Sequence, residues 1–484
     1  MIIKHKTNDE KGYEINFYHG VRVDVTGEGV FDIEFIDNDT DELIYKSSIT
    51  KGKYSKPNIE YYKNWKVNIT NNGITKTEYL ELEGKEVLIE LGNTSKALGD
   101  SVSWMPYAEE FRKKHNCIVY CKTSWVDLYK NSYPEINFIS EIGDLETYAS
   151  YLIVWYTEYH KSITPHNHID SPLQKLASDI LGLEYKEIRP KIDIEDSKRP
   201  IKEKYVCLSH HSTTNSKYWH YPYINSVKGW QKLVDWLNFI GYKIIVISKE
   251  KTNLRNVVDM TGDYPIKDRV NQIFHSEFFI GVSSGLSWLA WAIGKRVILI
   301  SGFTHPHFEF TENIIRVYND RVCNGCFNKF PFDKSDWNWC PEHKGTERQF
   351  ECTRNITPKM IADEITENQL VENKYYNFDV KIEDTKIPKN LIHTSYIDYE
   401  NKLIINYIGK NNINGINIDV IDDKNEILYT ILNTTLTNKF NNWTQLRKPE
   451  KYGLVSDKTK KLKIRFYKDK ILLEIILNFE KSKN

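Results

Sequence analysis

The feature that most constrains the fold of this chain is a repeated alternation of short apolar strands with helical segments. In a first block, apolar runs at 117–121 and 151–156 follow a helical pattern at 103–115. A second helical pattern at 172–182 begins beside a proline and ends on a glycine, as helices commonly do. Because such units build parallel sheets with helices on their faces, the block predicts a Rossmann-like domain, followed by a charged linker at 186–200.

A second block of the same kind follows the linker. Each of its apolar runs spans five to seven residues, which is a usual length for a buried strand. Two such blocks predict an α/β fold with two Rossmann-like domains that face a cleft. The predicted strands lie at 205–209, 242–248, 278–282 and 296–301, and a predicted helix lies at 286–293.

Four cysteines fall within one loop-like stretch of the second block. Cys323 and Cys326 are separated by two residues, Cys340 follows after thirteen more, and Cys352 after a further eleven. Four thiolates at such spacing can close a tetrahedral site around zinc or iron, and the metal would supply the folding energy of a loop with little core. Disulfides or unrelated thiols are the alternatives, and His343 could replace one cysteine as a ligand. Because four protein ligands leave no open position, we expect a structural metal.

The two ends of the chain resemble each other. Residues 29–45 and 415–429 each contain an alternating apolar strand, an acidic turn and a second strand. A closing apolar strand follows each of them, at 86–91 and at 471–476. We therefore predict small β domains at both ends, with chance similarity between hairpins as the alternative. The predicted domains are a β domain at 1–92, Rossmann-like domains at 93–198 and 199–375, the second carrying a four-cysteine metal finger at 318–356, and a β domain at 385–484.

Composition excludes several classes of protein. A chain of 484 residues is long enough for about three or four domains. Lysine plus arginine and aspartate plus glutamate both number 66, and this balance argues against a nucleic-acid-binding protein that relies on bulk charge. No apolar run approaches the ~20 residues of a membrane span, and the first residues contain no apolar secretory segment. We therefore expect a cytoplasmic protein.

One aspartate is a candidate catalytic base. The segment 91–101 follows a predicted strand and precedes a predicted helix, so we expect a loop there. In open α/β sheets, ligands bind outside the carboxyl ends of strands, which would bring a substrate hydroxyl close to Asp100. A carboxylate in this position could accept a proton as a general base. The alternative is that Asp100 only caps the following helix.

Two turns of the second block carry groups that suit phosphate oxygens. Residues 209–219 follow a strand and concentrate hydroxyls, histidines and one lysine, although no Walker pattern is present. Residues 281–288 join a strand to a helix N-terminus, which attracts anions. The segment 302–307 follows the next strand and could line the same cleft. A polar surface loop and a plain strand–helix turn are the alternatives. The candidate donor-binding residues are Thr213, Thr214, Lys217, Ser283, Ser284, Gly285, Leu286, Ser287 and Thr304.

Four segments together resemble a known enzyme family. The segments 98–111, 181–191 and 284–289 and the four-cysteine loop are similar to those of the bacterial autotransporter O-heptosyltransferases. That family is related to the lipopolysaccharide heptosyltransferases of glycosyltransferase family 9. The resemblance covers roughly residues 1–375 and implies a GT-B fold.

The resemblance also implies an activity and roles for single residues. It implies an ADP-heptose donor and serine acceptors on an autotransporter-type adhesin, with inversion at the sugar. Asp100 would activate the acceptor, Lys217 would bind the donor diphosphate, and residues 284–287 would hold the nucleotide. The four cysteines would coordinate iron, with zinc as the alternative. Large ring-like homo-oligomers are also implied.

Two alternatives to this function differ in their acceptor or in having no activity. A lipopolysaccharide-core glycosyltransferase would share the fold, but such enzymes carry aspartate and histidine where this chain has Ser283 and Trp288, which favours a protein acceptor. The second alternative is a non-enzymatic assembly protein whose structure is stabilised by its metal. The predicted C-terminal β domain lies outside the resemblance and could change the assembly or the acceptor.

Overall fold

The computed structural model divides into two compact units, which are described separately. The first contains Met1–Ser226, Ile245–Asn253 and Val258–Ile356, and the second contains Val227–Ile244, Leu254–Val257 and Thr357–Asn484. The structure describes residues 11–92, 96–194, 198–211, 228–333, 335–336, 338–368 and 370–371, and the backbone of seven strands between residues 392 and 478.

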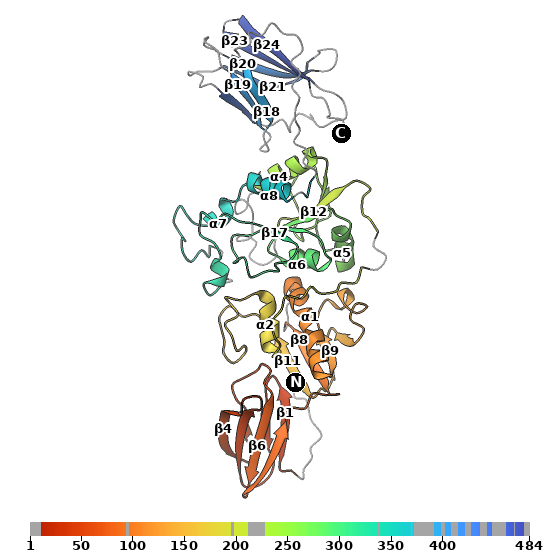
Figure 1. The fold of residues 1–484 in the computed structure, drawn as a ribbon, viewed down its shortest axis with the longest axis vertical. Helices are drawn as coiled ribbons and strands as arrows, with labels where there is room; N and C mark the ends of the chain where they lie inside the picture. The colour runs from red at the N-terminus through yellow and green to blue at the C-terminus, as the bar shows by residue number, and fades with distance from the viewer. Residues whose placement is uncertain are drawn as a thin grey trace. The chain divides into compact units, whose positions relative to one another are not determined.

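The first unit contains a seven-stranded sheet with a parallel centre (Figure 1). Its order is β10-β9-β8-β11-β1-β2-β5, and the run β10-β9-β8-β11 corresponds to a Rossmann order of 3-2-1-4. The winding direction therefore changes between β8 and β11, where ligands bind outside the carboxyl ends of the strands. The elements are β1 (Tyr13–Tyr18), β2 (Arg22–Val25), β5 (Tyr54–Ser55), β8 (Glu86–Leu91), α1 (Leu98–His115), β9 (Ile118–Lys122), η1 (Val126–Leu128), β10 (Ile136–Ile139), β11 (Ala149–Ile153) and α2 (Leu173–Ile180).

The strand at 86–91 belongs to this parallel sheet and does not close a β domain as predicted. β8 pairs in parallel with β9 on one side and β11 on the other, and only its first residue is exposed. Continuous burial is typical of a central parallel strand that is covered on both faces. β1 extends the same sheet through the parallel pair Phe17 and Ala149. The division into four domains, with its boundaries, stays a prediction.

A separate four-stranded antiparallel sheet forms the rest of the N-terminal region. Phe31, Ile33 and Phe35 alternate with more exposed residues along β3 and are buried, which is the pattern of a strand with one face in the core. The predicted hairpin at 29–45 is confirmed, because β3 and β4 pair antiparallel. The order is β4-β3-β6-β7, with β3 (Val30–Asp37), β4 (Glu42–Thr50), β6 (Trp65–Asn71) and β7 (Ile74–Tyr79).

The second Rossmann-like element is a six-stranded sheet. Its order β14-β13-β12-β15-β16-β17 corresponds to 3-2-1-4-5-6, so the winding direction changes between β12 and β15. The predicted strand at 205–209 is confirmed in full, and the other three predicted strands form with slightly shorter bounds. The elements are β12 (Tyr205–Ser209), β13 (Lys243–Val246), β14 (Val258–Asp259), α5 (Ile266–Phe274), β15 (Phe279–Val282), α6 (Gly285–Ala292), β16 (Val297–Ile300), β17 (Ile314–Val317), η2 (Cys326–Asn328) and α7 (Glu351–Arg354).

The second unit contains two helices and the C-terminal strands. The predicted hairpin at 415–429 is confirmed by the antiparallel pairing of β20 and β21. The strands that follow the two hairpins differ in their pairing. At the N-terminal end, β6 begins at Trp65 and pairs directly with β3 of the hairpin. At the C-terminal end, β22 begins at Trp443 and pairs with β19, which belongs to another sheet than the hairpin. The sheets are β18-β19-β22 and β21-β20-β23-β24. The elements are α4 (Lys228–Phe239), α8 (Pro358–Glu367), β18 (Ile392–Ile397), β19 (Lys402–Tyr407), β20 (Gly415–Ile421), β21 (Ile427–Thr435), β22 (Trp443–Arg447), β23 (Lys461–Lys468) and β24 (Lys470–Asn478).

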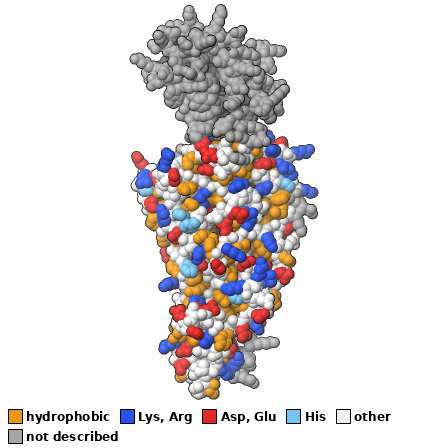
Figure 2. Space-filling view, viewed as in Figure 1, with side chains coloured by type: hydrophobic (Ala, Val, Ile, Leu, Met, Phe, Trp, Pro, Cys, Tyr) orange, Lys and Arg blue, Asp and Glu red, His pale blue; other side chains and the backbone are white. Residues whose placement is uncertain are grey.

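The surface matches the neutral composition of the chain. Figure 2 shows acidic and basic side chains interspersed over the described part of the face that it draws. Within the described residues, no helix is both long enough and apolar enough to cross a bilayer.

Candidate active site and cysteine cluster

Asp100 lies in the first turn of α1, just beyond the carboxyl end of β8. The loop predicted at 91–101 is therefore shorter than expected, and Ala97 occupies the cap position that the alternative interpretation gave to Asp100. A carboxylate in the first turn of a helix is stabilised by the helix dipole. The next residue, Ser101, is buried, and its hydroxyl lies 2.9 Å from Thr123 Oγ1 at the end of β9. These contacts hold the turn of Asp100 at the carboxyl edge of the first parallel sheet.

The N-terminal turns of α1 and α6 touch each other. A Cβ added to Gly285 would lie 2.8 Å from Leu98 Cβ and 2.9 Å from Gly99 N. A Cβ on Gly99 would lie 3.4 Å from Gly285 Cα and 3.2 Å from Trp288 Cδ1. Only glycine at position 285 permits this approach without displacement of the backbone. The turn that carries Asp100 is therefore packed against the turn predicted to bind an anion.

The turn before α6 presents its helix N-terminus and one unused hydroxyl. Ser284 caps α6 in an extended conformation, and its side chain makes no capping hydrogen bond. Its Oγ is buried and has no hydrogen-bond partner within the described residues. A buried polar atom of this kind costs free energy unless a ligand or water satisfies it. Helix N-termini bind anions through their free N–H groups, so this turn fits a phosphate.

Three other predicted donor-binding hydroxyls are used inside the protein. Ser283 Oγ and Thr304 Oγ1 both donate to Glu309 Oε1, the second at 2.7 Å. Ser287 Oγ donates to Val282 O at 2.6 Å. All three serine and threonine side chains are buried. In this structure these hydroxyls therefore support the turn rather than reach into open space.

A buried ion pair holds the same region together, and the sequence interpretation missed it. Arg316 Nη1 lies 2.5 Å from Glu309 Oε2, and the two side chains are 9% and 1% exposed. Arg316 also donates to Thr304 O at 3.0 Å and to Thr304 Oγ1 at 2.7 Å. The only sequence signal is a charged residue inside each of two apolar runs, around Glu309 and in β17. The pair links β17 to the segments that follow β15 and β16.

Three predicted donor residues, Thr213, Thr214 and Lys217, lie outside the described residues. The described chain before them ends at the carboxyl end of β12, where His210 N donates to Ser248 Oγ at 3.2 Å. His211 follows, and burial lowers the pKa of its imidazole. The assignment of the three donor residues stays a prediction, as do the roles of Asp100, Leu286 and the residues around Ser284.

The four cysteines of the predicted metal finger gather in one place. All seven cysteines of the chain are described, and each of them is a free thiol in this structure, which does not favour the disulfide alternative. A hydrogen bond with Cys323, then burial and the nearby Cys326 and Cys340 sulfurs, raise the pKa of the Cys352 thiol. Burial raises the pKa of Cys326 to about 12, and Glu342, Cys323 and Cys340 add to the shift. Neighbouring thiols of which at least Cys326 and Cys352 resist ionisation form a donor set that a bound cation would neutralise, so these residues fit a metal.

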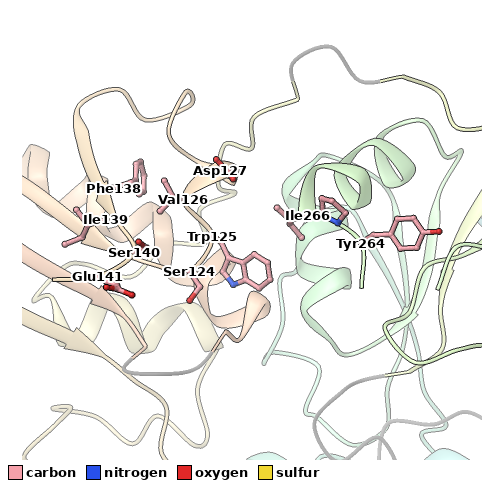
Figure 3. A pocket seen from close by; sticks show the side chains of 11 residues that line it. Ser124, Trp125, Val126, Asp127, Phe138, Ile139, Ser140, Glu141, Tyr264 and Ile266 are labelled. Atoms are coloured by element: carbon pink, nitrogen blue, oxygen red, sulfur yellow. The ribbon is translucent and has the colours of Figure 1, made fainter. Parts of the chain in front are cut away.

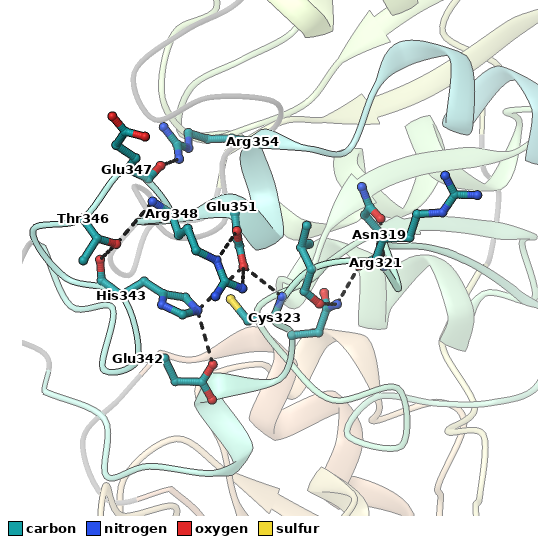
Figure 4. A network of polar contacts seen from close by, with 12 residues as sticks. Asn319, Arg321, Cys323, Glu342, His343, Thr346, Glu347, Arg348, Glu351 and Arg354 are labelled. Atoms are coloured by element: carbon teal, nitrogen blue, oxygen red, sulfur yellow. Dashed lines mark hydrogen bonds and ion pairs between the residues drawn. The ribbon is translucent and has the colours of Figure 1, made fainter.

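Three further side chains surround Cys323 (Figure 4). Arg348 makes a bidentate pair with Glu351, at 2.5 and 3.0 Å, and lowers the pKa of that carboxyl to about 2. The Cys323 amide donates to the same carboxylate at 3.2 Å. One ligand atom each of Cys323, His343 and Glu351 lies within 4.8 Å of the others, and His343 Nε2 has no hydrogen-bond partner among the described residues. The ligand atoms of Cys323, His343 and Glu351 are therefore placed to hold a metal, and the four-cysteine finger itself stays a prediction.

The cysteine loop is tied to both Rossmann-like elements of the first unit. Gly325 N donates to Gly302 O at 2.9 Å, just beyond β16. Asn328 accepts from His305 N at 2.8 Å and donates to Ile169 O at 2.7 Å. The loop therefore contacts segments that follow the strands of both parallel sheets.

Comparisons with known proteins agree with this geometry. The profile of Glycosyltransferase family 9 (heptosyltransferase) matches residues 142–331. The chain is 34% identical to the autotransporter heptosyltransferase Aah of Escherichia coli over 371 residues, which cover 73% of this chain and 92% of Aah. It is 31% identical to an inactive autotransporter heptosyltransferase, BimC of Burkholderia thailandensis, over 72% of this chain and 84% of BimC.

Solved structures of similar sequence also match this chain. The iron-containing dodecameric glycosyltransferase TibC of enterotoxigenic E. coli superposes with a TM-score of 0.67 at 32% identity. The match covers 73% of this chain and 95% of TibC. A second TibC structure, in complex with ADP-D-beta-D-heptose, gives the same TM-score and identity.

Proposed function

The chain belongs to the autotransporter heptosyltransferases of glycosyltransferase family 9, and from that premise we propose that it transfers heptose from ADP-heptose to serine hydroxyls of an autotransporter-type adhesin. The enzyme class is a protein O-heptosyltransferase. The observation that carries the proposal is the contact between Gly99 and Gly285, which packs the turn of Asp100 against the N-terminus of α6. A base and an anion site on adjoining turns are what a transfer from a nucleotide sugar to a hydroxyl requires. The two Rossmann-like elements would form a GT-B arrangement.

In the proposed mechanism the acceptor attacks from the face opposite the leaving nucleotide. The serine oxygen forms a bond to the anomeric carbon while Asp100 accepts the hydroxyl proton. The bond from the anomeric carbon to the phosphate oxygen breaks, and ADP leaves with the electron pair. The configuration at the anomeric carbon is thereby inverted. A positioned general base of this kind typically contributes a factor of ~10²–10⁴ in rate.

The leaving diphosphate carries the negative charge that develops in the transition state. The N-terminus of α6 and the unused Ser284 hydroxyl would stabilise it, because aligned backbone N–H groups act as a partial positive charge. Lys217 would add a compact positive charge to the same phosphates. Glu309 and Arg316 act indirectly, by holding Ser283 and Thr304 in place.

The metal would have a structural role. Its ligands would be Cys323, Cys326, Cys340 and Cys352, and the metal would be iron, with zinc as the alternative. It would fix a loop that is hydrogen-bonded to Gly302, His305 and Ile169. TibC is dodecameric and contains iron, which supports a homo-oligomer and iron for this chain. A cytoplasmic location stays a prediction.

The test is transfer to a protein acceptor. The purified chain is incubated with ADP-heptose and either a serine-rich autotransporter passenger or a lipopolysaccharide core. The mass added to each acceptor is then measured by mass spectrometry. We expect heptose on serines of the passenger. Modification of the lipid alone would support the lipopolysaccharide-core alternative. No transfer and no binding of ADP-heptose would support a non-enzymatic role, for which the inactive relative BimC gives a precedent.

A further inference from the structure

A cleft lies beside the turn that carries Asp100, at the carboxyl ends of two strands of the first parallel sheet. Its volume is about 740 Å³. One wall follows β9 and β10 and includes Trp125, Asp127 and Glu141, and the other is the start of α5, with Tyr264 and Ile266. Figure 3 shows Trp125 directed from the first wall towards the second. A hollow at the carboxyl ends of parallel strands is the usual place for a ligand in such folds.

Two hydrogen bonds connect this cleft to the turn of the candidate base. Trp125 N donates to Thr123 Oγ1 at 3.2 Å, and Thr123 Oγ1 lies 2.9 Å from Ser101 Oγ. Ser101 is the neighbour of Asp100 in the chain. An extended peptide advances about 3.3 Å per residue, so a chain whose serine sits at Asp100 would reach the cleft within a few residues.

The lining suits a polypeptide better than an anionic lipid core. The charged side chains of the cleft are both acidic. Asp127 is paired with Lys130 at 2.8 Å, whereas Glu141 is exposed and makes no ion pair with any described residue. Uncompensated negative charge repels phosphorylated sugars and attracts basic groups, and it does so most strongly at low salt.

Tyr264 is held in place before any ligand arrives. Tyr264 is 44% exposed, and Arg269 lies 4.7 Å from the centroid of its ring. The guanidinium of Arg269 is itself bonded to Met260 O and Gly262 O. Trp125 Nε1 is a buried donor without a hydrogen-bond partner among the described residues, and the ring itself lines the cleft. Rigid aromatic side chains with a polar end are effective contacts for peptide.

We infer that this cleft binds the segment of the acceptor polypeptide next to the modified serine, and that Glu141 selects neutral or basic residues in that segment. The inference rests on the proposed function and adds the chemistry of the acceptor to it. Trp125 and Tyr264 contact the backbone and apolar parts of the segment, and Glu141 interacts electrostatically with its charged residues.

The experiment compares two serine-containing peptides that differ only in flanking residues, lysines in one and aspartates in the other. They are glycosylated by the full chain, by Glu141→Lys and by Glu135→Lys, a matched control on an exposed glutamate before the opposite end of β10. We expect the wild-type protein and the control to prefer the lysine peptide by ~5-fold in kcat/KM at low salt, the size of one exposed charge pair. Glu141→Lys should reverse the preference, and Trp125→Ala should raise KM for both peptides without changing the affinity for ADP-heptose.

The outcomes distinguish a failure of this inference from a failure of the proposed transferase function. Transfer by Glu141→Lys with the preference of the control would overturn the inference and leave the transferase intact. Failure of the wild-type protein to modify either peptide, or any serine-rich passenger, would overturn both.

Discussion

Gly285 and Gly99 approach so closely that a Cβ on Gly285 would lie 2.9 Å from the Gly99 nitrogen. This contact joins the first turn of α1, which carries Asp100, to the first turn of α6. The candidate base and the candidate anion site therefore lie on adjoining turns, although Asp100 and Gly285 are 185 positions apart in the sequence.

The first prediction concerns this contact. Gly285→Ala should reduce both the melting temperature and the affinity for ADP-heptose, because its Cβ would meet the backbone of Gly99 and the Cβ of Leu98. Gly99→Ala is the matched control and should do less damage, since its nearest contacts would be at 3.2 Å or more. Thermal unfolding and calorimetry of donor binding measure the two effects. Equal behaviour of the two variants would contradict the close packing of the two turns.

The second prediction concerns the buried pair of Glu309 and Arg316. Arg316→Met should lower the free energy of unfolding by about 3–5 kcal/mol, because it leaves a buried carboxylate without its partner. Lys113→Met removes a partner of exposed ion pairs and should cost less than about 1 kcal/mol. Urea unfolding compares the two variants. If Arg316→Met lowered the free energy of unfolding no more than the control does, the buried pair would not contribute substantially to stability.

The third prediction concerns the metal. Cys326→Ser should lose bound metal and fold less stably, because it removes one of four gathered sulfurs. Asp100→Asn serves as the control and should keep its metal, since Asp100 is not part of the cysteine cluster. Elemental analysis of the purified proteins gives the metal content per chain. Full metal content in Cys326→Ser would favour a ligand set that uses His343 instead.

The fourth prediction concerns acid stability. Burial, with a smaller effect of Lys114, lowers the pKa of His115 from 6.5 to about 4. The folded protein therefore binds this proton less readily than the unfolded chain, and stability falls as the pH drops from about 6.5 towards 4. The ring centroids of His115 and Phe111 lie 4.4 Å apart, so His115→Phe should keep the packing and weaken the pH dependence. Unfolding midpoints at pH 7 and pH 5 measure the change, and an unaltered pH dependence in the variant would refute it.

Local patterns in the sequence were sufficient to predict much of the fold. The strand at Tyr205–Ser209 and the helix that follows Ser284 are defined by apolar runs and by a glycine at the end, which act over a few residues. The start of α1 was missed because Leu98 and Gly99 pack against Gly285, a contact between distant segments. The same holds for Glu309 and Arg316, whose pairing depends on how β17 lies beside the preceding strands.

Prediction of the site from the sequence was limited in the same way, because contacts between side chains are decided by the fold. The cysteine spacing predicted a four-cysteine metal site, which stays a prediction, and it gave no sign that Glu351 and its partner Arg348 would lie beside Cys323. Hydroxyls suit phosphates, which made Ser283 and Thr304 candidate donor ligands, and their bonds to Glu309 became visible only in the structure. Residue type indicates what a side chain can bind, whereas the fold decides which partner it meets.

The most direct test of the proposed mechanism measures Asp100→Asn with ADP-heptose and a serine-rich acceptor. The substitution keeps the size of the side chain and removes its ability to accept the proton. We predict that the affinity for ADP-heptose stays within error of the wild-type value while the rate of transfer falls by ~10²-fold or more. Transfer at a rate near that of the wild-type protein would contradict the central claim that Asp100 is the base.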